Sequence, residues 1–165
     1  MSQKNKPSSV DFDIGVDAVI PSTQEAFREG FDGAVRRAEK QDLVSFRDIL
    51  GVELDRQLKD ASQFPSSREL FVFIVQYFVA EKEYARRDID NMAKTVLDVL
   101  KGRFYHDDSQ VKVLLVGKKG VDNRVTQNFA YIAIKELSAG KEMEVMKVAG
   151  VERAVTLFQQ THKKV

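Results

Sequence analysis

Four aspartates, arranged as two close pairs, are the residues of this chain best suited to chemistry. Asp88 and Asp90 stand two positions apart, and Asp107 and Asp108 are neighbours. Carboxylates that are brought together repel one another unless a cation lies between them. Oxygen ligands of this kind suit Mg²⁺ or Mn²⁺. Each pair also has an ordinary interpretation, because aspartate is common at helix N-caps and in turns.

Positive charge surrounds these aspartates. Lys94 follows Asp90 by one helical turn, so it is placed either for an ordinary surface ion pair or to face a phosphate or an attacking water beside a metal. A site for a cation alone gains nothing from basic neighbours, whereas one that also receives a polyanion such as nucleic acid needs both signs. A chain with 31% charged residues also forms such clusters by chance. Residues 82–119 hold these lysines and arginines: Lys82, Arg86, Arg87, Lys94, Lys101, Arg103, Lys112, Lys118 and Lys119.

The composition narrows the possible classes of protein. The chain has 165 residues, 43% of them hydrophobic, which suits one folded domain. It contains no cysteine and only two histidines, so a hard-metal site must be built from carboxylates. The lack of cysteine is compatible with a reducing cytosol. No apolar run approaches the roughly 18–20 residues of a membrane span, and the N-terminus lacks the apolar core of a signal peptide. We therefore expect a cytoplasmic protein without a membrane partner.

Hydrophobic periodicity predicts an α+β fold, with a mixed β-sheet of about four strands and helices packed on its faces. The segment 69–80 is apolar enough to be a central strand that is buried on both faces. Segments with the character of strands are 11–20, 69–80, 110–119 and 125–137. Segments with helical spacing are 21–41, where Ser22-x-x-Glu25 has capping-box spacing, 45–61 and 90–101.

The same patterns indicate one domain. We expect a flexible tail at 1–10, a domain at 11–140 with a helical insertion at 21–62, a turn at 120–124, and a C-terminal helix of the same domain at 141–165. The two aspartate pairs lie at opposite ends of the predicted helix 90–101. They reach the same rim of the sheet only if the segment 102–106 doubles back.

The segment from roughly 69 to 119 resembles the RusA family of Holliday junction resolvases, the crossover junction endodeoxyribonucleases. An apolar strand leads into Arg-Asp-x-Asp-Asn-x-x-Lys at 87–94, and Asp-Asp-x-Gln-Val follows at 107–111. The pattern is specific as a combination, although each piece is weak alone. The resemblance implies a RusA-like α+β fold and a small homodimeric, Mg²⁺-dependent endonuclease that makes paired symmetric nicks in DNA four-way junctions during recombination and repair. Many family members belong to phages.

Site residues follow from the resemblance position by position. The implied metal ligands and catalytic carboxylates are Asp88, Asp90 and Asp108, the catalytic lysine is Lys94, and the supporting residues are Asn91, Asp107 and Gln110. Mn²⁺ is expected to substitute for Mg²⁺, and no organic cofactor is expected. Candidates for contacts with the DNA backbone are Arg86, Arg87, Lys112, Lys118 and Lys119.

Two other functions stay open from the residues alone. A non-catalytic protein that keeps the RusA-like fold would bind DNA junctions without cutting them. An enzyme using Asp-x-Asp with Mg²⁺ or Mn²⁺ on a nucleotide would need a deep pocket, and the absence of a Gly-rich phosphate loop disfavours it. The insertion at 21–62 and the long C-terminal stretch depart from the family pattern, which leaves the dimer contact and the junction specificity open.

Overall fold

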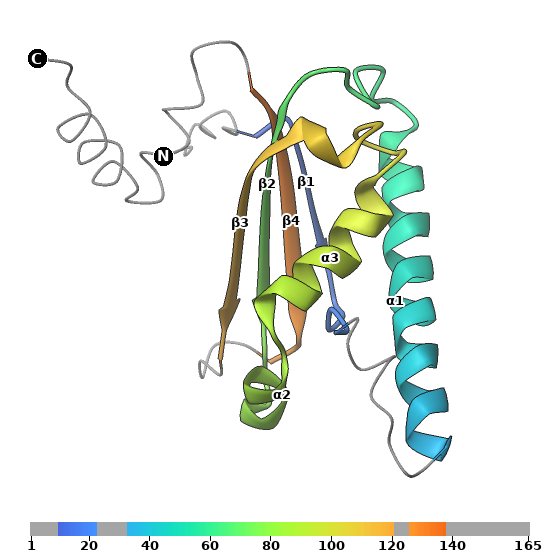
Figure 1. The fold of residues 1–165 in the computed structure, drawn as a ribbon, viewed down its shortest axis with the longest axis vertical. Helices are drawn as coiled ribbons and strands as arrows, with labels where there is room; N and C mark the ends of the chain where they lie inside the picture. Colours follow the sequence, from blue (N-terminus) through green and yellow to red (C-terminus); the bar gives the residue numbers. More distant parts are fainter. Residues whose placement is uncertain (1–9, 23–32, 121–125, 138–165) are drawn as a thin grey trace, which may run out of the picture.

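The computed structural model describes residues 10–22, 33–120 and 126–137. The predicted α+β class is confirmed: a four-stranded mixed sheet carries the two long helices, α1 and α3, on one face (Figure 1). The strands are β1 (Phe12–Val16), β2 (Leu70–Tyr77), β3 (Val111–Lys119) and β4 (Phe129–Glu136). The helices are α1 (Gly33–Leu58), α2 (Glu81–Arg86), α3 (Ile89–Leu100) and the 3-10 turn η2 (Asp108–Gln110).

The order of strands in the sheet is β1-β4-β2-β3. β4 is antiparallel to both of its neighbours, with Ile132 opposite Ile14 on one side and Ile74 on the other. β2 and β3 are parallel, so Ile74 also lies opposite Val116. Parallel strands need a crossover connection, and here α2 and α3 provide it. β1 and β3 are therefore the two edges of the sheet that the described residues form.

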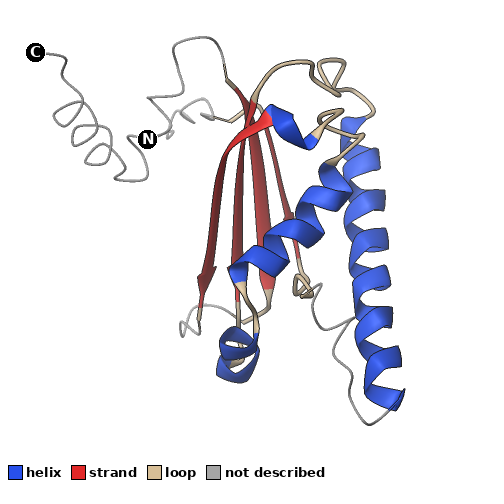
Figure 2. Ribbon diagram, viewed as in Figure 1, coloured by secondary structure: helices blue, strands red, loops and turns tan. Residues whose placement is uncertain are grey.

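The central strand β2 differs from its prediction in one respect. Leu70, Val72 and Ile74 are fully buried, but the alternate residues, such as Phe71 and Phe73, are only half-buried. The expectation of burial on both faces is wrong for the described part of the chain, because α1 and α3 both lie on the same face (Figure 2). The apolar residues of the other face are partly shielded by their own neighbours, as where the Phe73 and Tyr131 rings meet edge to face at 5.8 Å between centroids.

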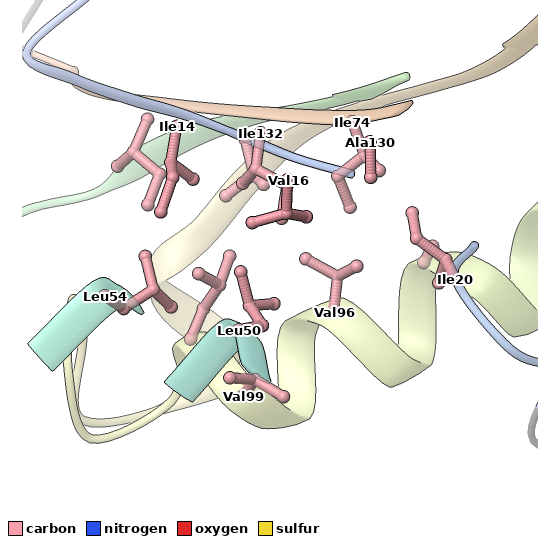
Figure 3. Close-up of a cluster of buried hydrophobic side chains, with 14 of the residues drawn as sticks. Ile14, Val16, Ile20, Leu50, Leu54, Ile74, Val96, Val99, Ala130 and Ile132 are labelled. Atoms are coloured by element: carbon pink, nitrogen blue, oxygen red, sulfur yellow. The ribbon is translucent and has the colours of Figure 1, made fainter. Parts of the chain in front are cut away.

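The core lies between the covered face of the sheet and the two long helices (Figure 3). Ile14, Ile74 and Ile132 point down from the sheet, while Leu50 comes from α1 and Val96 from α3. Leu50, Ile74, Val96 and Ile132 are completely buried. Burial of each such side chain contributes about 1.5–3 kcal/mol relative to exposure, so α1 and α3 are held to the sheet mainly by apolar contact.

The helical insertion differs from its prediction as well. Instead of a first helix to 41 and a second from 45, one helix, α1, runs without a break from Gly33 to Leu58. No proline interrupts this stretch, and Ser45 can act as a cap only if the chain before it is not helical. Ser22 is not helical, and the residues that follow it, 23–32, lie outside the described part. So do most of the predicted tail, the turn after Gly120, and the C-terminal helix 141–165.

The short helix α2 was not predicted, because its six residues are too few to show a period. It fills the space between the end of β2 and the start of α3. Among the described residues, no helix is both long enough and apolar enough to span a bilayer.

Truncation of a core residue on α1 should show how strongly this helix is attached. Leu54→Ala removes a fully buried side chain, and we expect the free energy of unfolding to fall by about 2–5 kcal/mol. Val52→Ala is the control, because Val52 is 70% exposed on the same helix and its loss should change stability by no more than about 0.5 kcal/mol. Urea unfolding followed by circular dichroism measures both. Equal effects would show that α1 is not packed as described.

Candidate active site

Asp88 and Asp90 stand where α3 begins. Arg87 and Asp88 have extended backbones, with φ −94° and ψ 123° for the first and φ −89° and ψ 133° for the second. Asp88 is the N-cap residue, and its carbonyl accepts a bond from the Met92 amide at 3.1 Å. Its side chain, however, makes no capping hydrogen bond. The ordinary explanation for this aspartate, helix capping by the carboxylate, is therefore not realised.

Lys94 is exposed one turn further along the same helix. Within the described part of the chain, the side chains of Asp88, Asp90 and Lys94 take part in none of the ion pairs or hydrogen bonds. The surface pair between Asp90 and Lys94 that the spacing allows is absent, since no nitrogen–oxygen distance of 4.0 Å or less joins them. All three side chains point to solvent from the N-terminal half of α3.

The opposite side of α3 anchors the helix. Its buried residues are Asn91, Met92, Ala93, Thr95, Val96, Val99 and Leu100. The Thr95 hydroxyl donates a hydrogen bond to the Pro21 carbonyl at 3.0 Å, which ties α3 to the segment that follows β1. Asn91, a predicted supporting residue, is one of these buried residues. The exposed groups are thus displayed by a helix that has little freedom to move.

Lys118 fixes the backbone just before α3. Its ammonium donates hydrogen bonds to the carbonyls of Tyr84 and Arg87, each at 2.7 Å, and lies 4.5 Å from the centre of the Tyr84 ring. The Arg87 carbonyl belongs to the peptide that leads directly into Asp88. Although the sequence predicted a contact with DNA for Lys118, its side chain is turned inward and fixes the backbone just before the acidic pair.

The neighbouring basic residues are partly engaged as well. Arg87 is 9% exposed, and its guanidinium donates to Glu83 at 3.1 Å. Arg86 is half-exposed and lies 3.9 Å from the same carboxylate. Lys112 pairs with Glu69 at 3.6 Å, and the exposed Lys119 lies 6.0 Å from the centre of the Tyr77 ring. Of the predicted DNA contacts, Arg86, Lys112 and Lys119 keep a large exposed surface.

Asp107 has a structural role in the turn before β3. Its carboxylate accepts a hydrogen bond from the Ser109 amide at 2.9 Å, while the Gln110 side chain accepts one from the Asp107 amide at 3.0 Å. The hydrogen bonds from Ser109 lower the pKa of Asp107. Gln110 also donates to the Ser66 carbonyl at 2.8 Å. Together, these two predicted supporting residues form a capping box that fixes the turn.

Asp108 projects from this turn and is exposed, and its carboxylate accepts a hydrogen bond from Lys101 at 3.0 Å. That contact raises the pKa of the Lys101 ammonium. Lys101 is the C-cap residue of α3. Asp108 therefore lies near the C-terminal end of the helix whose N-terminal end carries Asp88 and Asp90.

The two aspartate pairs do not come together within one copy of the chain. α3 has 12 residues, and at about 1.5 Å per residue it is about 18 Å long. Gly102, with φ 82°, turns the chain sharply, and the hydroxyl of the buried Tyr105 donates to the Leu97 carbonyl at 2.9 Å. The segment 102–106 is thereby pinned to the nearer end of the helix. Accordingly, no group of three or more potential metal ligands occurs among residues 10–22, 33–120 and 126–137.

Sequence reasoning missed two features that position the site. The first is the orientation of Lys118, whose ammonium donates to two carbonyls of the α2–α3 junction. No local sequence pattern predicts this contact. Gln76 does have a signal, as the one polar residue in the apolar run 70–77. It is fully buried, accepts a bond from the Ile20 amide at 2.9 Å and donates to the Ala18 carbonyl at 3.0 Å, which holds the segment after β1 against the sheet.

A comparison with known protein families finds a match over residues 15–128 to the family described as Endodeoxyribonuclease RusA. This chain belongs to the RusA family. The matched range contains both aspartate pairs and Lys94, and membership implies an endodeoxyribonuclease that acts on Holliday junctions. The search of curated proteins found no match.

We expect Lys118→Met to loosen the start of α3 and to lower nicking of DNA junctions at saturating DNA by about tenfold or more, because small displacements of reacting groups are costly. The salt dependence of DNA binding should stay unchanged, since the Lys118 ammonium already donates to the carbonyls of Tyr84 and Arg87. Lys119→Met is the matched control: it should weaken binding and reduce the salt slope by about 1, with normal nicking at saturation. If Lys118→Met behaved like the control, the lysine would be a DNA contact.

Proposed function

We propose that this RusA-family chain is a homodimeric, Mg²⁺-dependent endonuclease that resolves Holliday junctions by paired nicks. The observation that carries the proposal is the exposed trio Asp88, Asp90 and Lys94 at the start of α3. None of its side chains is neutralised by a described neighbour, whereas charges around it are paired, as Arg87 is with Glu83 at 3.1 Å. The proposal includes action in the cytoplasm, with which a chain without cysteine is compatible.

The donor set suits Mg²⁺. This ion prefers oxygen ligands and is commonly held by one or two carboxylates together with water and substrate phosphate. One copy of the chain offers Asp88 and Asp90 for this purpose, and Mn²⁺ takes the same ligands. The third implied ligand, Asp108, lies near the far end of α3, about 18 Å away along the helix axis. Within one copy, the described residues therefore supply two of the three carboxylates.

A second copy supplies the missing ligand. In a dimer with two-fold symmetry, Asp108 near the C-terminal end of α3 in one copy can lie beside the N-terminal end of α3 in the other copy. Symmetry then places the second Asp108 beside the first helix in the same way. Each site then combines Asp88 and Asp90 with Asp108 of the partner subunit. A four-way junction has near two-fold symmetry, so two such sites match two equivalent strands and give paired nicks.

The chemistry is hydrolysis of a phosphodiester. Bound Mg²⁺ supplies charge stabilisation at the phosphate and an acidic water. The oxygen of water bonds to phosphorus, the bond from phosphorus to the leaving sugar oxygen breaks, and the proton from water ends on that oxygen. Lys94 faces the developing negative charge on the phosphate oxygens, and the N-terminus of α3 adds its partial positive charge nearby.

Contacts with the DNA backbone are assigned to the exposed basic residues. Arg86, Lys112 and Lys119 are exposed around the start of α3 and along β3. Phosphate contacts of this kind release counterions, so binding should weaken steeply as salt rises. Lys118 contributes through the backbone that it holds, while the guanidinium of Arg87 is paired with Glu83.

Cleavage of a labelled four-way junction tests the activity. We expect symmetric nicks that require Mg²⁺ or Mn²⁺, that disappear with EDTA, and that fall by about a hundredfold or more in Asp90→Asn, because a ligand to the metal is lost. Asp60→Asn, at an exposed position beyond α1, is the control and should cut normally. Tight junction binding by the wild type without nicks, across several sequences and with both metals, would instead indicate a non-catalytic junction-binding protein.

A subunit-mixing experiment tests the shared site. Asp90→Asn and Asp108→Asn should each be inactive alone, yet after exchange of subunits a mixed dimer has one intact site, formed by Asp90 of one chain and Asp108 of the other. Random exchange makes about half of the dimers mixed, so about a quarter of the sites should be active, and their nicks should no longer be paired.

The matched control mixes Asp88→Asn with Asp90→Asn. Both substitutions fall on the same half of the site, so every site keeps one defect and no activity should return. If the Asp90→Asn and Asp108→Asn mixture also stayed inactive while subunit exchange was shown by mass spectrometry, the carboxylates would not be shared between subunits.

A further inference from the structure

The face of the sheet that points away from α1 and α3 carries a row of aromatic side chains. Alternate residues of a strand point to opposite faces, and the register of β2 and β4 puts their aromatic residues on the same side. We call this side the open face, because neither long helix lies on it (Figure 2). Its aromatic residues are half-buried: Phe71, Phe73 and Tyr77 on β2, and Phe129 and Tyr131 on β4.

The two faces of these central strands differ in the kind of apolar residue that they present. On the covered face, β2 and β4 carry aliphatic side chains such as Val72, Ile74 and Ile132, all completely buried. Every aromatic residue of β2 and β4 lies on the open face. Strand propensity favours aromatic residues without choosing between faces, so it does not account for this separation. The rings are gathered where another molecule can reach their π faces.

The rings of the open face are held in place. The Tyr131 hydroxyl donates a hydrogen bond to Asp13 at 3.0 Å, and the Phe73 and Tyr131 rings meet edge to face. Gly15 on β1 leaves room for the Phe129 ring, which a Cβ atom at that position would overlap. Rings that are already ordered lose little conformational freedom when a ligand binds.

Lysines stand at both ends of this aromatic row. Lys119 is exposed, pairs in register with Tyr77 and lies 6.0 Å from the centre of its ring. At the other end, Lys135 pairs in register with Phe71. Among the residues of the four strands, Asp13 is the one carboxylate on this side, and the tyrosine hydroxyl described above already binds it. The charge of the open face therefore favours an anionic ligand.

We infer that the open face binds single-stranded DNA, with bases stacked on the rings of β2 and β4 and phosphates beside Lys119 and Lys135. Every unpaired base has a π face to offer, whereas the bases of a duplex stack on one another, so aromatic residues on an open sheet select single strands. Phe71 and Tyr77 are six residues apart, which makes the row about 20 Å long. That length suits a short stretch of strand rather than one nucleotide.

This surface goes beyond the proposed function, because it lies across the sheet from α3 and needs no metal. The two are nevertheless adjacent at one end of the sheet. Lys118 and Lys119 are consecutive residues of β3: the first holds the Arg87 carbonyl just before Asp88, and the second is at the end of the aromatic row. An unpaired strand that leaves a DNA branch at the acidic pair therefore reaches the open face from this end.

Binding of a fluorescent oligonucleotide of about twelve thymidines, followed by anisotropy in EDTA, tests the inference. We expect Phe73→Leu and Tyr77→Leu each to weaken binding by about fivefold or more, because leucine keeps the apolar contact but has no π face for a base. Affinity for a duplex of the same length should stay unchanged. Since EDTA prevents cutting, the result is independent of whether the chain nicks junctions.

Phe46→Leu is the matched control. Phe46 is 3% exposed and belongs to the core on the covered face, so its replacement should leave binding of the oligonucleotide unchanged. Circular dichroism shows that each variant is folded, and two separate substitutions on the open face guard against the failure of one. The inference is overturned if the wild type does not bind the oligonucleotide, or if both open-face variants bind it as tightly as the wild type.

Photocross-linking identifies what occupies the open face. With p-benzoylphenylalanine in place of Phe73, ultraviolet light should join the full chain to the thymidine oligonucleotide, and excess unlabelled oligonucleotide should suppress the product. Mass spectrometry of the digested product locates the bond. Attachment to residues 138–165 of the same chain, or to a second copy, in the presence of saturating oligonucleotide would show that protein covers this face, which also overturns the inference.

Discussion

The packing of α3 against the sheet is the constraint on which the other features of this molecule depend. Val96 and Leu100 are completely buried against the sheet and α1, so the helix acts as a rigid bar of about 18 Å. Asp88 and Asp90 lie at its N-terminal end, and at its C-terminal end Lys101 forms an ion pair with Asp108. The same contacts that stabilise the fold therefore keep the implied ligands of one metal site apart.

The charged side chains at the two ends of α3 differ in whether they have an ion-pair partner. Near its C-terminal end, Asp108 is paired with Lys101 at 3.0 Å, whereas Asp88, Asp90 and Lys94 have no ion-pair partner among the described residues. Two neighbouring carboxylates at an exposed surface repel each other only weakly, and a bound cation would remove that repulsion. In a surface ion pair such as that of Lys101 and Asp108, the net stabilisation is small, so a partner subunit or a metal can replace it at little cost.

The shared site that we propose would link DNA cutting to assembly of the dimer. If each site needs groups from two chains, a lone subunit has no complete site and cannot make an unpaired nick. Both sites of a dimer then come into being at the same moment. For a four-way junction, which must be cut on two equivalent strands, this coupling favours symmetric resolution.

Much of this protein could be predicted from residue types and their spacing. The apolar run at β2, the helical period at α3 and the Asp-x-Asp pattern with Lys94 led to the α+β fold and to the RusA family, because local periodicity and motif chemistry are properties of short stretches of chain. Helix α1 was predicted as two helices, since a start signal such as Ser45 cannot show whether the preceding chain is already helical.

Only the tertiary structure decided where the side chains point and which of them meet. Lys118 turns inward because two carbonyls of the α2–α3 junction lie within 2.7 Å of its ammonium, a contact between residues more than 30 positions apart. Asp108 stays at the far end of α3 because Gly102 and Tyr105 pin the intervening turn. Sequence by itself determined the kind of chemistry this chain carries, whereas the distances between its charges depend on long-range packing, which no local pattern encodes.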